Sequence, residues 1–415
     1  MNKVITPFVP KGTINVPGSK SYSHRYLIGS FLSDKLITLN NIYYSNDVLA
    51  TLSCLNMMGG RFEINESQTI SIKKIIKESD SIILNAEESA STLRMLLPIS
   101  SFLYKNVTFI GNKSLFLRPL DAFKSIFDKE KIHYEHKENS IEKNGLLSMK
   151  IFDCSSKTSS QFMSGMLFLA AFCNSKYKIT YSEPIVSRKY LDMTLKVLKD
   201  FGYSFKELDN SFSLETKEEP KTSEFTIEGD YSSAANFIVL GALKGEITLS
   251  NLNAESIQPD SIIIKLLKSI GANITYINNC IKISSVNNLK SFRFNIDESI
   301  DLGPILIVLA SQIKGQSIIE GVNRLKIKES DRLSSILIEL NKAGLEYEVK
   351  NDSIYIQGKE SYKDGIIFES HNDHRITMAL TIFSILTNGT NTINNVECVN
   401  KSYPTFFLDL EKLRK

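Results

Sequence analysis

The sequence predicts an α/β protein built from six similar units, each about 70 residues long. Two series of helical patterns alternate along the chain, and each series recurs at a nearly constant spacing. Short runs of β-branched and aromatic residues lie between the helices, for example at residues 107–110, 225–227 and 354–356. Because a unit of this length is too long for the common solenoid repeats, we expect the units to close into compact domains.

The first series consists of amphipathic helices, in which apolar residues recur at helical spacing. These helices are expected to begin at Asp47, Asp121, Asp192, Asp260, Asp331 and Pro404. Five starts are acidic, which the helix dipole favours, and four of the helices are followed by glycine. The intervals between successive starts are also nearly equal, as expected of an internal repeat.

The second series consists of helices that are almost wholly apolar or small, a pattern typical of helices buried on all sides. They are expected to begin near Ser19, Ser89, Ser159, Ser232, Asp301 and Asn372. Their starts recur at the same interval as those of the first series. Two interleaved series in register are difficult to explain by chance, and they define six units.

The composition excludes several classes of protein. The chain has 49 basic and 46 acidic residues, and this net charge of +3 is too small for a general nucleic-acid or membrane-surface binder. The five cysteines are far apart with no CxxC pair, so neither a zinc site nor a disulfide framework is indicated. There is no apolar run long enough to span a membrane and no signal-peptide pattern, so we expect a cytoplasmic protein.

Cations occupy the first turns of several buried helices. Lys20, Arg25, Arg94 and Arg375 stand where the positive end of the helix dipole disfavours them. N-capping explains a single Ser, Thr or Asp at such a position, but it does not explain these cations. Because free N–H groups and guanidinium groups both bind anions, the pattern predicts an anionic ligand between helix starts.

The segment Lys326–Arg332 mixes basic and acidic residues. It is either a solvated run of charges or a site where cations hold an anion while a carboxylate moves protons. Spacing alone leaves both interpretations open. His371 and His374 lie close together in the sequence, but no third metal ligand is indicated.

The motifs at these helix starts resemble those of the 5-enolpyruvylshikimate-3-phosphate synthase family. The matching segments are residues 17–25, 118–120, 159–162, 186–190, 228–234, 328–332 and 372–375, with Lys401 before Tyr403 and Pro404. They occur in the family's order and together are highly specific.

The resemblance implies two similar α/β domains, each with three βαβαββ repeats around buried helices, an arrangement called an inside-out α/β barrel. The chain would cross between the domains near Gly18 and Glu228. The expected domains are residues 1–18 with 229–415, and residues 19–228, with the active site in the cleft between them. The first strand would therefore join the C-terminal half.

The resemblance also implies a reaction. The enolpyruvyl group of phosphoenolpyruvate would pass to the 5-hydroxyl of shikimate 3-phosphate, with release of phosphate and without a metal or organic cofactor. Both substrates are small polyanions whose mutual repulsion must be offset by fixed cations. The implied enzyme is a monomer without nucleic-acid or membrane partners.

The family's functional residues carry over to matching positions. The implied ligands of phosphoenolpyruvate are Lys20, Arg94, Arg118, Gln161, Arg332, Arg375 and Lys401. The implied ligands of shikimate 3-phosphate are Lys20, Ser21, Arg25, Ser159, Ser160, Gln161, Ser187, Tyr190, Asp301 and Lys328.

Three residues are implied to act in the chemical step. Glu329 would donate a proton to the methylene carbon and later remove one, while Asp301 would orient and deprotonate the hydroxyl. Lys20 would assist the departing phosphate, and His374 would support the site.

Ala90 departs from the family pattern, in which this position is commonly glycine. The methyl group would stand against bound glyphosate, an inhibitor longer than phosphoenolpyruvate, so we expect reduced glyphosate sensitivity. Alanine also suits a helix better than glycine, which alone would account for it.

Three other functions compete with this one. A UDP-N-acetylglucosamine enolpyruvyl transferase shares the fold, but this chain lacks an obvious counterpart of its catalytic-loop cysteine. A non-catalytic protein that binds phosphorylated metabolites would be expected to have lost Asp301 and Glu329, and both are present. An enzyme acting on RNA ends would be expected to carry more positive charge.

Overall fold

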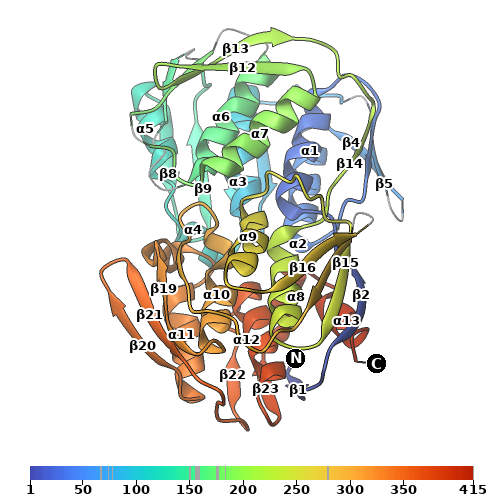
Figure 1. The fold of residues 1–415 in the computed structure, drawn as a ribbon. Coiled ribbons are helices and arrows are strands. Elements are labelled where there is room, and N and C mark those ends of the chain that lie inside the picture. Colours follow the sequence, from blue (N-terminus) through green and yellow to red (C-terminus); the bar gives the residue numbers. More distant parts are fainter. Residues whose placement is uncertain are drawn as a thin grey trace. The chain divides into compact units, whose positions relative to one another are not determined.

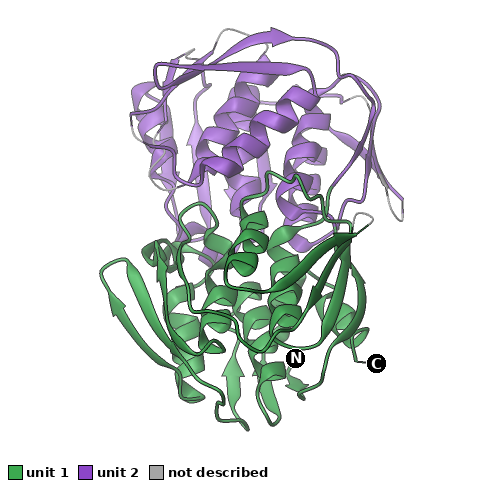
Figure 2. Ribbon diagram, viewed as in Figure 1, with its two compact units in different colours: residues 1–17, 228–415 green, residues 18–227 purple. Residues whose placement is uncertain are grey.

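The computed structural model describes residues 1–65, 68–72, 74–76, 78–148, 151–154, 159–173, 177–182, 184–277 and 280–414. The chain forms two compact units, coloured separately in Figure 2. Unit 1 comprises Met1–Pro17 and Glu228–Lys415, and unit 2 comprises Gly18–Ile227. Among the described residues, no helix combines the length and apolar character needed to cross a bilayer.

The described strands pair in six open sheets, three in each unit. In unit 2 the sheets are β6 (Ser81–Asn85), β7 (Asn106–Ile110), β9 (Ser140–Asn144) and β8 (His133–His136); β10 (Ile151–Asp153), β11 (Lys178–Thr180), β13 (Ser211–Lys217) and β12 (Tyr203–Leu208); and β14 (Glu224–Thr226), β3 (Ile37–Asn40), β5 (Gln68–Ile72) and β4 (Arg61–Ile64). In unit 1 they are β2 (Lys11–Asn15), β15 (Glu246–Ser250), β17 (Cys280–Ser284) and β16 (Asn273–Ile277); β18 (Arg293–Asn295), β19 (Gly315–Glu320), β21 (Ser353–Gly358) and β20 (Glu346–Lys350); and β22 (Ile367–Glu369), β23 (Asn391–Asn394) and β1 (Lys3–Ile5).

The same pairing pattern recurs in all five four-stranded sheets. The first two strands of each sheet are parallel, and the remaining pairs are antiparallel. Side chains alternate in burial along these strands, as where β15 buries Ile247 and Leu249 and leaves their neighbours partly exposed. The recurring order agrees with the βαβαββ repeat, and the fold class is the one predicted.

Two strands pair with strands from the other half of the sequence. β2 precedes the first helix of unit 2 but pairs in parallel with β15 of unit 1. β14 precedes a helix of unit 1 but pairs in parallel with β3 of unit 2. β1 also joins unit 1, where it is antiparallel to β23. These pairings explain why unit 1 is built from two separate stretches of the chain.

The predicted buried helices are confirmed, and each begins within two residues of its predicted start. They are α1 (Lys20–Leu32), α3 (Ala90–Leu103) and α6 (Ser160–Cys173) in unit 2, and α8 (Tyr231–Leu243), α10 (Gly303–Ser311) and α12 (His374–Leu386) in unit 1. Every residue of α10 is buried. Within unit 1, α8, α10 and α12 pack against one another and form the centre of the unit (Figure 1).

The amphipathic helices, with one exception, also begin within two residues of their predicted starts. The series is α2 (Asn46–Met57), α5 (Asp121–Lys129), α7 (Arg188–Asp200), α9 (Ile262–Ser269), α11 (Arg332–Lys342) and α13 (Phe406–Glu411). Shorter helices are α4 (Lys113–Phe116), η1 (Pro259–Ser261), η2 (Ile300–Leu302), η3 (Val322–Ile327) and η4 (Val396–Lys401).

The predicted start of α7 at Asp192 was wrong by one turn. The helix begins at Arg188, after Ser187 in a left-handed backbone conformation. Asp192 does not cap the helix because its Oδ1 accepts a hydrogen bond of 2.8 Å from Arg188 Nε, one turn earlier. An acidic residue inside a helix therefore imitated a start signal.

Lys143 on β9 closes the end of α3. Its side chain is buried, and Nζ donates to the carbonyl oxygens of Ser101 at 3.1 Å and Tyr104 at 2.7 Å. These carbonyls lack partners within the helix, so a lysine is a suitable cap. Burial lowers the pKa of Lys143 to about 8, because the buried ammonium group has lost its water.

This lowered pKa predicts a specific dependence of stability on pH. Between the folded pKa and the ordinary unfolded value, the unfolded chain binds more protons, so the stability contributed by Lys143 rises with pH. Relative to Lys143→Met, we expect the wild type to gain about 1–2 kcal/mol between pH 7.5 and 9.5. Thermal unfolding of both proteins at both pH values measures this gain, and a stability difference that does not change with pH would contradict it.

Candidate active site

Arg332 is the centre of a buried charge cluster in unit 1. It is the first residue of α11 and is only 1% exposed. Its Nε donates to Asp373 Oδ2 at 2.8 Å, Nη1 to Asp301 Oδ1 at 2.9 Å, and Nη2 to Glu329 Oε2 at 2.6 Å. Burial alone would lower the pKa of Arg332, but Asp373, Glu329 and Asp301 together raise it. One guanidinium thus holds both predicted acid–base residues in fixed positions.

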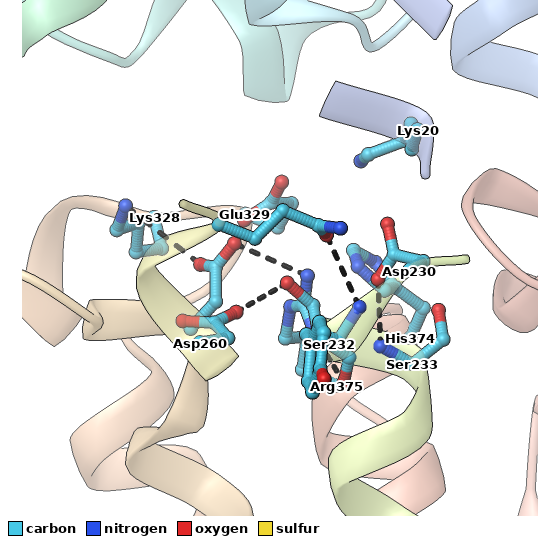
Figure 3. A network of polar contacts seen from close by, with 12 residues as sticks. Lys20, Asp230, Ser232, Ser233, Asp260, Lys328, Glu329, His374 and Arg375 are labelled. Carbon is cyan, nitrogen blue, oxygen red and sulfur yellow. Dashed lines mark hydrogen bonds and ion pairs between the residues drawn. The ribbon is translucent and has the colours of Figure 1, made fainter. Parts of the chain in front are cut away.

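Asp301 is surrounded by cations in the same cluster. Besides its bond to Arg332, it accepts a hydrogen bond of 3.1 Å from Arg375 Nη2 at Oδ2, and Lys328 Nζ lies 3.9 Å from Oδ1 (Figure 3). Burial raises the pKa of Asp301, but Arg375, Lys328 and Arg332 outweigh it and hold the pKa below its usual range. Asp301 is therefore ionised and can accept a hydrogen bond from a hydroxyl group.

The side chain of Lys328 has an unusually low pKa for a lysine. Burial lowers its pKa to about 8, although Asp301 opposes this effect. A lysine that titrates near neutral pH gains most from a second anion, because added negative charge restores its protonated form. Lys328 is therefore a cation beside Asp301 whose protonation increases when a second anion binds nearby.

The start of α12 is tied to the cluster by its cap. Asp373 accepts hydrogen bonds from the Arg375 amide at 2.9 Å and from the Ser330 hydroxyl at 3.1 Å, in addition to Arg332. His371 and Asn372, just before the cap, both have positive φ angles. The turn therefore presents Arg375 and the buried His374 from a fixed helix start. Lys401 is also buried, at the end of η4.

A second set of predicted residues lies in unit 2. Lys20 is the first residue of α1, behind the cap Ser19, and its Nζ contacts Asp47 Oδ2 at 2.8 Å. The pair is mostly buried, with side chains 16% and 7% exposed. Sequence reasoning used Asp47 only as a helix start and missed this contact, because the distance from Lys20 in sequence is 27 residues.

His24 lies one turn after Lys20 in a chain of buried hydroxyl groups. Its Nδ1 is 2.7 Å from Thr51 Oγ1, which is 2.6 Å from Thr92 Oγ1, and Thr92 donates to the Ser89 hydroxyl at 2.7 Å. Burial lowers the pKa of His24 to about 3, so the ring is neutral. The chain links the starts of α1 and α3.

Arg25 joins α1 to α7. Its Nε donates to Thr194 Oγ1 at 2.8 Å, Nη1 to the Ser21 carbonyl at 2.7 Å, and Nη2 to the Tyr190 carbonyl at 2.9 Å. The side chain is 2% exposed, and burial lowers its pKa to about 10. Three predicted ligands, Ser21, Arg25 and Tyr190, therefore lie together, but Arg25 is engaged with protein acceptors.

Arg94 and Gln161 form a third group, also in unit 2. Arg94 Nη1 donates to Gln161 Oε1 at 3.1 Å, and Nη2 to the Pro119 carbonyl, next to Arg118, at 3.0 Å. The guanidinium also lies over the Phe162 ring, 4.9 Å from its centroid. Three predicted ligands of phosphoenolpyruvate are thus brought together by α3, α6 and the loop after α4.

Small residues complete the surroundings of Arg94. Gln161 Nε2 donates to the Ser91 hydroxyl at 2.8 Å, and the backbone amide of Gln161 donates to Ser159 Oγ at 3.3 Å. Ser160 is buried as the first residue of α6. Ala90 is the first residue of α3 and is 7% exposed. Sequence reasoning missed Ser91, whose helical spacing from Arg94 was the available signal.

Ser187 has a strained backbone, with φ 53° and ψ 47°. The first turn of α7 behind it is held by Arg188, whose Nη1 and Nη2 donate to the two carboxylate oxygens of Glu207 at 2.7 and 2.6 Å. The Tyr190 amide donates to the Ser187 carbonyl at 3.0 Å. Ser187 and Tyr190 therefore belong to one rigid turn.

The model of the EPSP synthase (3-phosphoshikimate 1-carboxyvinyltransferase) family matches residues 9–410. The chain belongs to the EPSP synthase family. It is 37% identical to the 3-phosphoshikimate 1-carboxyvinyltransferase of Clostridium acetobutylicum and 35% identical to that of Clostridioides difficile, and each alignment covers 99% of this chain and 96% of the relative.

Solved structures agree with the EPSP synthase assignment. The EPSP synthase of Acinetobacter baumannii superposes with a TM-score of 0.81 at 26% identity, covering 99% of this chain and 98% of that one. The enolpyruvyl transferase NikO of Streptomyces tendae superposes with a TM-score of 0.74 at 13% identity, covering 99% and 96%, and shows the shared fold. The predicted family is therefore confirmed.

Proposed function

We propose that this protein transfers the enolpyruvyl group of phosphoenolpyruvate to the 5-hydroxyl of shikimate 3-phosphate and releases phosphate. The observation that carries the proposal is the cluster around Arg332, in which Asp301 and Glu329 share one buried guanidinium. Arg375 and Lys328 flank the same carboxylates. This arrangement combines fixed cations for two polyanions with two carboxyl groups for proton transfer.

Phosphoenolpyruvate would be held mainly by cations. The proposed ligands are Lys20, Arg94, Arg118, Gln161, Arg332, Arg375 and Lys401. Their support is that all of them except Lys20 and Gln161 are buried. Cations fixed in a site that excludes water interact more strongly with a phosphate or carboxylate than solvated ones.

Shikimate 3-phosphate would contact a largely different set. The proposed ligands are Lys20, Ser21, Ser159, Ser160, Gln161, Ser187, Tyr190, Asp301 and Lys328, with Arg25 behind them. Because the three nitrogens of Arg25 already donate to protein oxygens, we propose that it mainly fixes Ser21 and Tyr190.

The chemical step would use three proton transfers. Glu329 donates a proton to the methylene carbon while the 5-hydroxyl oxygen attacks the neighbouring carbon and loses its proton to Asp301. The resulting tetrahedral intermediate loses phosphate with assistance from Lys20, and Glu329 removes a proton from the methyl group to restore the double bond. His374, buried beside Asp373 at 3.9 Å, supports the helix start that carries Arg375.

The enzyme would act as a cytoplasmic monomer on small molecules alone. The near balance of 49 basic and 46 acidic residues supports the absence of a nucleic-acid partner, because general binders of nucleic acids carry a large positive excess.

Phosphorus NMR of the purified protein with both substrates tests the proposed function. We expect the phosphoenolpyruvate signal to be replaced by inorganic phosphate and by a new phosphorylated product that still carries the 3-phosphate. A protein that binds both substrates without converting them would contradict the proposal and favour a binding protein.

Ala90 leads to a prediction about inhibition. A methyl group at the start of α3 would exclude the longer glyphosate molecule more than phosphoenolpyruvate, so Ala90→Gly is expected to lower the inhibitory concentration of glyphosate at least tenfold. This corresponds to about 1.4 kcal/mol of binding free energy. Inhibition assays at fixed phosphoenolpyruvate measure the effect. Micromolar inhibition of the wild type would contradict it.

A further inference from the structure

Asp260 is a fully buried carboxylate to which none of the roles above is assigned. It lies in η1 with no exposed surface, and its Oδ2 accepts a hydrogen bond from the Ser232 hydroxyl. Its Oδ1 has no hydrogen-bond partner among the residues that the structure describes. An ionised carboxylate with one neutral donor is costly to bury, so this group requires an explanation.

Ser232 connects Asp260 to the charge cluster. Its carbonyl oxygen accepts a hydrogen bond of 3.3 Å from Arg375 Nη1, while Arg375 Nη2 donates to Asp301 Oδ2 at 3.1 Å (Figure 3). Asp260, Ser232, Arg375 and Asp301 thus form a continuous series of contacts inside unit 1. A change of charge at Arg375 must be felt at Asp260, because little water separates buried groups.

Asp260 differs from the other carboxylates of the cluster. Asp301, Glu329 and Asp373 each accept a hydrogen bond from Arg332. No ion pair of Asp260 is found among the described residues. When the total charge of the cluster must change, the carboxylate without a cationic donor is the least costly to neutralise.

The charged groups that face Asp260 come from three elements. Asp301 of η2 and Asp230, the cap of α8, repel its negative charge, while Arg375 of α12 attracts it. The lysines of α9, Lys265 and Lys268, are exposed. Burial, followed by Asp301, raises the pKa of Asp260 to about 7. The attraction of Arg375, together with the hydrogen bond from Ser232, keeps Asp260 partly ionised near neutral pH.

An anion bound by Arg375 would remove this attraction. We propose that Asp260 is the carboxyl group that takes up a proton when phosphoenolpyruvate binds at Arg375, so that the buried cluster keeps its charge balance. The proton comes from a buffer acid, which becomes its conjugate base, and forms an O–H bond at Oδ1, the oxygen without a partner among the described residues. This inference rests on the proposed function, since it takes phosphoenolpyruvate as the anion.

Titration calorimetry in buffers of different ionisation enthalpy counts the protons taken up. Phosphoenolpyruvate is titrated into the wild type and into Asp260→Asn at pH 8, without shikimate 3-phosphate, so that no turnover occurs. If binding raises the pKa of Asp260 by about one or two units, the wild type takes up about 0.4–0.8 proton more than the variant. The difference removes the contributions of Lys328 and of the phosphate, which both proteins share.

Two further variants keep the test decisive. Ser232→Ala removes the donor that favours the ionised form, so Asp260 is already more protonated before binding and the uptake at pH 8 is expected to fall. This variant carries the test if Asp260→Asn does not fold. Glu339→Gln is the matched control, because Glu339 is equally buried in unit 1 but already has Lys342 and His371 as partners. It is expected to keep the wild-type uptake.

The outcomes separate the inference from the proposed function. Equal proton uptake by the wild type and Asp260→Asn, or no binding of phosphoenolpyruvate to the wild type, overturns the inference. A parallel titration with shikimate 3-phosphate tests the proposed function, because its ligands do not include Asp260. Absence of binding in that titration overturns the proposed function as well.

Discussion

Replacing Asp301 with Asn is expected to lower kcat by a factor of about 10²–10⁴, with both substrates saturating. The amide keeps the size of the side chain but accepts no proton from the 5-hydroxyl. In the wild type both Arg332 and Arg375 donate to the Asp301 carboxylate, so the variant gives them a weaker, uncharged acceptor. Steady-state kinetics at saturating substrate measure the loss.

Two further variants define what the loss means. Glu329→Gln is expected to reduce kcat by a similar factor, because Glu329 is the second proposed proton-transfer group and is held by the same guanidinium. Asp297→Asn, just before η2 in the sequence, is the matched control and is expected to retain most of the activity. Near wild-type turnover by Asp301→Asn or Glu329→Gln would show that the catalytic roles are wrongly assigned.

Replacing Arg332 with Met is expected to have the largest effect on stability. The change leaves Asp301, Glu329 and Asp373 without their shared cation in a site where the arginine is 1% exposed. Removing one partner from a buried charge cluster typically costs about 3–5 kcal/mol. Thermal and denaturant unfolding of the purified variant measure this loss, and turnover should be lost with it.

Arginine at position 332 is expected to be required for more than its charge. Arg332→Lys keeps the charge, but one ammonium group cannot reproduce three separate hydrogen bonds in a plane, so stability should be restored only in part. Arg293→Met is the control, since this exposed arginine pairs with Glu320 at the surface and little change is expected. An Arg332→Met protein as stable as the control would refute the role of the cluster.

The helices were predictable because their signals are local. The apolar runs after residues 19, 89 and 301 follow from sequence alone, since a helix with no polar face must be buried. Asp192 misled the prediction because an acidic residue paired with Arg188 inside a helix resembles one at a helix start. The exchange of β2 and β14 between units depends on pairing between distant strands, which only the family resemblance indicated.

The site was predictable in its residues but not in their partners. Cations at helix starts pointed to an anion, and the family motifs named Asp301 and Glu329. Asp47 and Asp260 carried only the signal of a helix start, because their contacts with Lys20 and Ser232 span 27 and 28 residues of sequence. The engagement of Arg25 by Thr194 is a property of the packed helices, and nothing in the local sequence indicates it.

Phosphate release from phosphoenolpyruvate, measured with and without shikimate 3-phosphate, tests the central claim most directly. We expect the purified protein to release phosphate only when shikimate 3-phosphate is present, and to release none when UDP-N-acetylglucosamine replaces it. Release with UDP-N-acetylglucosamine, or no release with shikimate 3-phosphate, would contradict the function proposed for the Arg332 cluster.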